Sequence, residues 1–366
     1  MMQGLGRLRD RLLGRGEAAI TVPVFDGALK PNRLLEDAEV FVGDLSSPED
    51  IATDGESLFV ADGGRVLRIG ADGDRHELIC LPAQISALAC VGGGIAVAMN
   101  GSEVCVIGGA LDGRRWTAVE GVPLHAVNAL AVTPDGGLLA TEGSREHSWT
   151  EWKRDLMTHG RSGRALALDP GADDGQVLAR RLAYPFGACP IGDVLWLSES
   201  WRHRLLRIDP AGKALPLLEG LPAYPSRLSP AGGDGAWLTA FLPRSQLVEF
   251  VLREHGYRRR MLAEIAPEYW IAPALSSGRS FLEPMQGAQL KVMGVVKPWA
   301  PPRAYGLLIR LDAAGQPRYS LHSRFDGRHH GIVAAVEFSG RLHILSKGSR
   351  CVLRMDVSRF EQELRQ

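Results

Sequence analysis

The sequence lacks an excess of charge of either sign. Lys and Arg together number 42 and Asp and Glu together number 42 among 366 residues, so the formal net charge is zero. Without a surplus of basic residues, no long-range field draws the chain to nucleic acid or to an acidic membrane surface. We therefore expect no nucleic-acid partner.

Cysteine is scarce and poorly spaced for metal or disulfide chemistry. The five cysteines form no C-x-x-C pair, and none stands beside a cluster of histidines. Their odd number and wide separation favour neither a zinc site nor a disulfide framework. Because all five lie in or beside apolar runs, we interpret them as small buried thiols.

Long hydrophobic runs are also missing. The N-terminus shows no apolar stretch as long as a signal peptide or a membrane span. Instead Leu5, Leu8 and Leu12 recur at helical spacing among four arginines. This pattern predicts a short amphipathic helix in an N-terminal arm (residues 1–37) on a cytoplasmic protein without a transmembrane segment. Peripheral contact of the arm with a membrane is the alternative.

What the sequence does have is glycine, 43 residues, and an internal repeat. Short Val-, Leu- and Ile-rich runs bounded by Gly, Pro and Asp are typical of antiparallel strands, and a unit of three or four such runs returns six times. Units of this kind must stack to bury their faces, which predicts an all-β, six-bladed β-propeller over residues 38–366. The last copy lacks a fourth strand, and the run Ala38 to Leu45 is expected to supply it. The copies begin at Pro48, Ala83, Val127, Pro185, Tyr224 and Gly331.

Two copies carry insertions between their second and third strands, at residues 144–162 and 242–304. Insertions at one position of a repeat map to one face of the assembly. We therefore expect them to form a mixed helix and loop lid over one mouth of the central channel, with Trp149 among its substrate-binding aromatic residues. Padding over exposed strand edges is the alternative.

Several motifs, in order along the chain, carry a family resemblance. The runs "VPVFDGALKPN", "SPEDIATDG", "GRALALDP" and "VEFSGRLHIL", with Tyr-Pro pairs at Tyr184 and Tyr224, span nearly the whole sequence. The chain resembles strictosidine synthase-like proteins, part of the six-bladed propeller superfamily that includes gluconolactonases and paraoxonase-type lactonases.

The resemblance implies two kinds of chemistry. Lactonase-type members hold calcium or a similar cation at the channel mouth through a Glu of the first blade and Asn or Asp side chains of later blades. Glu49 and Asn128 match that pattern, so they are the metal ligands if a cation is bound. Phe186 and Arg227, at positions equivalent to Asn128, depart from it, because a phenyl ring cannot ligate and a guanidinium repels a dication. Calcium needs six to eight oxygens, so we expect no cofactor, or weak calcium binding at most.

Arg227 is expected to take the place of the lost cation by pairing with the Glu49 carboxylate. The alternative is an Arg227 that points to solvent and a Glu49 that caps a turn. With Asn128 and Phe186, these residues form the predicted substrate-binding set.

The second kind of chemistry belongs to strictosidine synthase itself, which places a catalytic Glu near its last blade. Glu337 aligns with that position, and we expect it to act as acid and base, with His330 orienting or sharing the proton. The alternative is a Glu337 that is exposed at a strand end or pairs with a neighbouring Arg, and a solvated loop histidine.

Three functions follow from these expectations. The favoured one is hydrolysis of a lactone or ester, in which Glu337 acts as acid and base while Asn128 and Arg227 polarise a carbonyl oxygen. The others are C–N bond formation in an amine–aldehyde condensation of the Pictet-Spengler type, and non-catalytic binding of a small molecule or protein. Propellers host all three.

Overall fold

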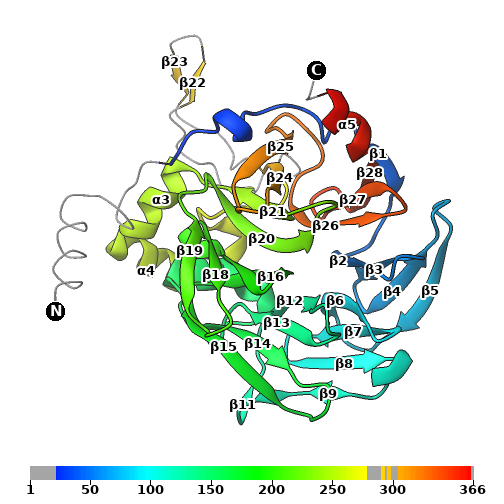
Figure 1. The fold of residues 1–366 in the computed structure, drawn as a ribbon. Helices are drawn as coiled ribbons and strands as arrows, with labels where there is room; N and C mark the ends of the chain where they lie inside the picture. Colours follow the sequence, from blue (N-terminus) through cyan, green and yellow to red (C-terminus); the bar gives the residue numbers. More distant parts are fainter. Residues whose placement is uncertain (1–21, 278–289, 293–294, 298–303, 364–366) are drawn as a thin grey trace.

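The chain folds into six four-stranded antiparallel blades arranged around a central axis (Figure 1). The computed structural model describes residues 22–277, 290–292, 295–297 and 304–363. The predicted helix near Leu5, Leu8 and Leu12 lies outside these ranges. Among the described residues no helix is long and apolar enough to cross a membrane.

Each blade runs from an inner strand at the axis to an outer strand at the rim. In chain order the blades are β2 (Pro48–Thr53), β3 (Leu58–Asp62), β4 (Arg65–Ile69), β5 (Arg75–Cys80); β6 (Ile85–Val91), β7 (Gly94–Met99), β8 (Glu103–Ile107), β9 (Arg115–Trp116); β12 (Val127–Val132), β13 (Leu138–Glu142), β14 (Gly163–Leu168), β15 (Gly175–Leu182); β16 (Pro185–Ile191), β17 (Val194–Glu199), β18 (Arg204–Ile208), β19 (Ala214–Leu218); β20 (Ala223–Pro230), β21 (Ala236–Pro243), β24 (Gly306–Leu311), β25 (Pro317–Ser323); and β26 (Ile332–Phe338), β27 (Arg341–Ser346), β28 (Cys351–Met355), β1 (Glu39–Val42).

The inner strands contact one another in succession and close a ring, with β26 packed against both β20 and β2. The six-bladed all-β fold predicted from the repeats is therefore confirmed. The last blade takes its outer strand from the start of the chain: β1 pairs antiparallel with β28, Val40 opposite Leu353 (Figure 1). This is the position expected for the run Ala38 to Leu45.

The residues just before β1 also belong to the ring. Asn32 donates to the carbonyl of Ser320 at 2.7 Å and accepts the amide of His322 at 3.0 Å, both on the outer strand of the fifth blade. Leu35 is fully buried. Residues 27–37, which include the short 3₁₀ helix η2 (Gly27–Leu29), thus form a strap from the fifth blade to the sixth.

The described helices and the remaining short elements lie outside the blades. They are α2 (Trp152–Thr158), α3 (Gln246–Arg253), α4 (His255–Glu264), α5 (Val357–Glu363), the 3₁₀ turns η3 (Gly109–Leu111), η4 (Trp149–Glu151), η5 (Ser200–Arg202) and η6 (Pro267–Tyr269), and the hairpins β10 (Ala118–Val119) with β11 (Val122–Pro123) and β22 (Leu290–Val292) with β23 (Val295–Lys297).

Both insertions leave the ring between the second and third strands of a blade, after β13 and after β21. Helix α2 of the first contacts α4 of the second. His159, just after α2, lies with its Nε2 2.8 Å from the carbonyl of Leu252 in α3. Residues 144–162 and 242–277 therefore sit together, and we call them the lid.

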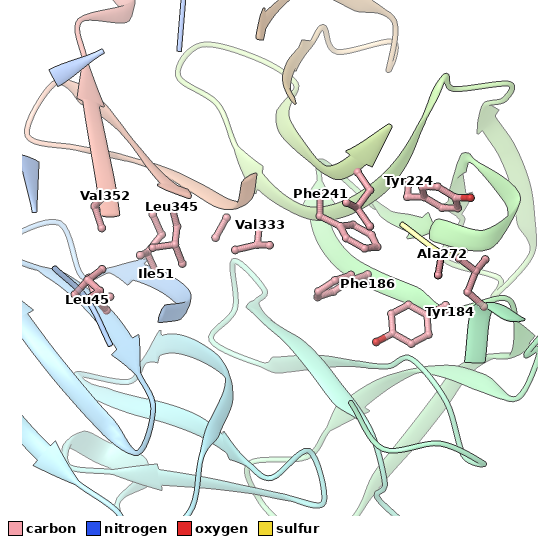
Figure 2. Packing of buried hydrophobic residues seen from close by; sticks show 14 of the residues in the cluster. Leu45, Ile51, Tyr184, Phe186, Tyr224, Phe241, Ala272, Val333, Leu345 and Val352 are labelled. Atoms are coloured by element: carbon pink, nitrogen blue, oxygen red, sulfur yellow. The ribbon is translucent and has the colours of Figure 1, made fainter. Parts of the chain in front are cut away.

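Buried apolar side chains of the lid and of the inner strands form one continuous cluster. Figure 2 shows Phe186 of β16 and Phe241 of β21 close to Tyr184, Tyr224 and the lid residue Ala272. The lid is thus packed onto the channel end at which the inner strands begin, and we call that end the mouth.

Candidate functional site at the channel mouth

The guanidinium of Arg227, on inner strand β20, is anchored at the axis of the ring. Its Nη1 donates to the carbonyls of Glu49 at 2.9 Å and Val333 at 3.3 Å. Its Nη2 donates to the carbonyls of Ser86 at 2.9 Å and Asn128 at 2.6 Å. Because the two Nη atoms carry four protons, these four carbonyls use all of them.

Two further groups surround the guanidinium. Its Nε lies 3.2 Å from Oδ2 of Asp50 as an ion pair, and its Cζ lies 5.0 Å from the centre of the Phe186 ring. Burial raises the pKa of the Asp50 carboxyl to about 6, although Arg227 and the amides of Leu88 and Ile51 favour the ionised form. All four Nη protons of Arg227 are therefore bound within the protein and none is left for a substrate, whereas its Nε has the Asp50 ion pair but no hydrogen bond.

The expected pair between Arg227 and the Glu49 carboxylate does not form. Arg227 binds the backbone carbonyl of Glu49, and the acid beside it is the neighbouring Asp50. The pairing of β2 with β3 shifts register between Pro48 and Asp50, which interrupts the regular alternation of side chains at Glu49. The contacts then give Asp50 to the guanidinium.

The Glu49 carboxylate binds the ammonium of Lys347 instead. Lys347 lies in the turn between β27 and β28, and its Nζ lies 5.5 Å from the centre of the Trp149 ring in η4 of the lid. The Glu49 side chain is 7% exposed and that of Lys347 is 25% exposed. A buried carboxylate and a partly open ammonium thus meet at the mouth beneath a lid tryptophan.

Asn128 is held by its neighbours on the third and fourth blades. Its Nδ2 donates to the carbonyl of Pro185 at 3.0 Å, and its Oδ1 accepts the hydroxyl of Thr141 at 2.7 Å. The Tyr184 hydroxyl also hydrogen-bonds with Asn128, and burial raises the pKa of that phenol. These partners occupy Asn128 as a structural amide.

Tyr184 adopts a left-handed backbone conformation, with φ of 58°. That conformation is uncommon for a bulky residue and persists where the surroundings hold it. Its ring stacks on Trp201 at 4.4 Å between centres and meets Phe186 edge-on at 5.8 Å. Gly143 leaves room for it, since a Cβ there would lie 2.8 Å from the Tyr184 ring. The strained residue thus positions an aromatic wall beneath the lid.

A lid carboxyl lies behind that wall. Asp155 of α2 accepts the indole N–H of Trp201 at 2.7 Å. Burial raises the pKa of the Asp155 carboxyl, while its hydrogen bonds to Ser144 and Trp201 lower it. This pairing ties α2 to the aromatic side chains of the fourth blade.

The residues around the axis do not fit a calcium ion. Calcium takes six to eight oxygens, whereas here a guanidinium holds four of the inward carbonyls and a phenyl ring covers one side. The Asn128 oxygen already accepts a hydroxyl. In the part of the chain that the structure describes, no cluster of three or more His, Cys, Asp or Glu could hold a metal.

Glu337 does not join this site. It lies on β26 four residues beyond Val333, whose carbonyl binds Arg227, so it is about 13 Å further along the strand. Its carboxylate accepts the amide of Gly232 at 2.9 Å and the indole N–H of Trp237 at 2.7 Å. One alternative was an exposed strand-end acid, and Glu337 is exposed near the end of β26.

His330 lies on the mouth side, just before β26. Its Nε2 lies 2.8 Å from the carbonyl of Arg324, and its own carbonyl accepts the amide of Gly348, next to Lys347. Its described contacts hold the loop that supports the Lys347 turn and do not link it with Glu337.

Sequence reasoning missed Lys347 and Asp50. Asp50 stands directly beside Glu49 in the sequence, and the register shift between Pro48 and Asp50 interrupts the two-residue period that would have told the two acids apart. No local pattern marks Lys347, because its partner Glu49 is 298 positions away.

The comparisons with known proteins agree with this fold. A scan against protein-family models finds no match. The human adipocyte plasma membrane-associated protein is 24% identical over 378 residues, covering 92% of this chain and 81% of that protein. Protein STRICTOSIDINE SYNTHASE-LIKE 6 of Arabidopsis thaliana is 26% identical over 226 residues, covering 56% of this chain and 60% of that protein. The chain thus resembles strictosidine synthase-like proteins, as its motifs predicted.

Solved structures show the same propeller. A gluconolactonase of Xanthomonas campestris superposes with a TM-score of 0.55 and 16% identity, over 91% of this chain and 94% of that one. Regucalcin of Agrobacterium tumefaciens, a calcium-binding protein, gives 0.52 and 12%, over 87% of this chain and 92% of that one. At these identities the likeness establishes the fold.

Proposed function

We propose that the chain is a small-molecule hydrolase of lactone or ester bonds that acts at the channel mouth, with Glu49 and Lys347 as its working pair. The observation that carries the proposal is the ion pair between these residues above a channel plugged by Arg227. The propeller shared with a gluconolactonase supports the reaction class. Relative to the sequence prediction, the proposal moves the acid and base role from Glu337 to Glu49.

Lys347 supplies the positive charge that the reaction needs. Its ammonium has three N–H donors, and one of them is used by Glu49. The other two can bind a substrate carbonyl oxygen and stabilise the oxyanion that forms during attack. Arg227 cannot do this, because its Nη protons are bound to backbone carbonyls.

Glu49 acts on the attacking water. Its carboxylate takes a proton as the water oxygen bonds to the carbonyl carbon, and it returns that proton to the alcohol oxygen as the ester C–O bond breaks. The products are a carboxylic acid and an alcohol, joined in one molecule when the substrate is a lactone. The Trp149 ring packs beside the ammonium and covers a bound acyl group from the lid side.

The test is a panel of lactones, aryl esters and amine–aldehyde pairs given to the full chain and to two variants. Glu49→Gln should lower kcat about a hundred- to ten-thousand-fold, because an amide cannot take a proton. Lys347→Met should lower kcat about a hundred- to thousand-fold through loss of oxyanion stabilisation. Lys347→Arg keeps the charge and should recover part of that loss.

Glu337→Gln is the matched control, since it alters an acid of the same blade ring outside the mouth. We expect its hydrolytic rate to equal that of the unaltered chain. Loss of activity in Glu337→Gln together with full activity in Glu49→Gln would refute the proposal. Product from the amine–aldehyde pairs alone would contradict hydrolysis and favour the condensing reaction. No product from any substrate of the panel would count against catalysis.

A further inference from the structure

We infer that Arg227 is a built-in cation that ties the six blades together at the hub, and that the oxygens around it become an accessible cation site when its side chain is shortened. This inference stands on the hub geometry alone and does not depend on the proposed hydrolase activity.

The first argument is connectivity. Arg227 projects from β20, its four carbonyl partners lie on β2, β6, β12 and β26, and Phe186 beneath it lies on β16. Each of these strands is the inner strand of a different blade. One side chain therefore touches every blade of the ring.

The second argument is charge. The four carbonyl oxygens all point at the axis, and the Asp50 carboxylate, 2% exposed, lies among them. Buried acceptors and a buried carboxylate are costly unless a donor or cation satisfies them. Arg227 donates to the four carbonyls and places its charge beside Asp50, whose oxygens also accept the amides of Ile51 and Leu88. The second acid, Glu49, is compensated separately by Lys347.

The third argument comes from another buried arginine. Arg164 pairs through two nitrogens with Glu142 on the adjacent strand of the same blade, and it reaches one backbone carbonyl, that of Pro123. That contact set is an ordinary pair within a blade. Of these two arginines, Arg227 is the one that has several converging carbonyls around its guanidinium.

Shortening Arg227 would leave four carbonyl oxygens and one carboxylate facing a space of guanidinium size. Hard oxygen donors of this kind suit calcium, with water completing the shell. A planar guanidinium ion suits the same oxygens through its own N–H groups. Calcium and ethylguanidinium are both cations that inward-pointing carbonyl oxygens can bind, so both serve as probes of the site.

The experiment compares the thermal midpoints of the full chain, Arg227→Ala and Arg164→Ala in chelator, in millimolar calcium chloride and in millimolar ethylguanidinium. Ethylguanidinium reproduces the arginine side chain beyond Cβ. The unaltered chain should melt at the same temperature in all three solutions. Arg227→Ala should melt roughly 5 °C lower in chelator, because a buried pair and four carbonyl bonds are lost, and should recover at least half of that fall with one of the cations.

Arg164→Ala is the matched control. It removes an equally buried guanidinium but leaves one carboxylate and one carbonyl, so calcium should not restore its midpoint. An Arg227→Ala protein that melts like the unaltered chain, or that recovers with neither cation, would overturn the inference.

Arg227→Lys keeps the inference testable if Arg227→Ala does not fold. Its ammonium keeps the charge but has only three protons for the five groups. Its melting midpoint should lie between those of the unaltered chain and Arg227→Ala. If Arg227→Ala yields no folded protein, Arg227→Lys should still yield some. A lysine variant no more stable than the alanine variant would contradict a role for the cation.

Discussion

Removal of the strap and β1 should destabilise the whole ring, because the sixth blade is closed by residues from the start of the chain. A chain beginning at Gly43 loses the fully buried Leu35 and the 5%-exposed Val42. It also loses the pairing of β1 with Cys351–Met355 and the contacts of Asn32 with the fifth blade. The edge of β28 is then left unpaired.

The magnitude follows from these losses. Burial of a Leu or Val side chain contributes about 1.5–3 kcal/mol each, and a net hydrogen bond contributes about 1 kcal/mol. Two side chains and at least two bonds to Asn32 give about 5–8 kcal/mol. Unfolding entropy near 2.1 cal/mol/K per residue gives about 0.8 kcal/mol/K for this chain, so the midpoint should fall by about 6–10 °C.

Differential scanning calorimetry measures that fall directly. The control is a chain beginning at Val22, which keeps every contact used in this estimate. Two point variants separate packing from truncation: Leu35→Ala should cost about 2–5 kcal/mol, whereas Val24→Ala, at a side chain 73% exposed, should change stability little. Equal midpoints for the chains beginning at Gly43 and Val22 would refute the closure of the ring by β1.

Two further predictions concern stability. Burial lowers the pKa of His322 to about 4, below its ordinary 6.5, so its neutral form stabilises the fold above pH 6.5 and that contribution is lost as pH falls toward 4. In denaturant melts, the free energy of unfolding should therefore decrease less between pH 7 and pH 5 for His322→Asn than for the exposed control His76→Asn. Equal decreases in the two variants would contradict this prediction. Glu337→Gln should cost about 1–3 kcal/mol, since the backbone amide of Gly232 and the indole N–H of Trp237 lose a charged acceptor, and an unchanged denaturation midpoint would count against those bonds.

The sequence predicts the repeat-level architecture well, because each blade has its own local signature. Short apolar runs between Gly, Pro and Asp mark individual strands, and the missing last strand points to the run around Val40. The shared insertion position likewise places α2 beside α4 on one face. All of these features depend on contacts within a repeat or on the equivalence of repeats.

The site is predicted only in part, because its contacts join distant repeats. Counting equivalent positions brings Asn128, Phe186 and Arg227 to the axis, where the structure has them. The count gives no side-chain direction, so it does not separate Asp50 from Glu49 as the partner of Arg227. A motif match gives Glu337 a place in a blade but not its distance from the mouth.

The account's central claim is that the positive charge at the mouth belongs to the chain itself, to Lys347 above a channel filled by Arg227. The most direct measurement is the rate of hydrolysis of the best substrate from the panel, first in excess chelator and then with added calcium. We expect the same kcat in both solutions and a loss of about a hundredfold or more in Lys347→Met under each. Activity that chelator abolishes and calcium restores, with Lys347→Met unaffected, would contradict the account.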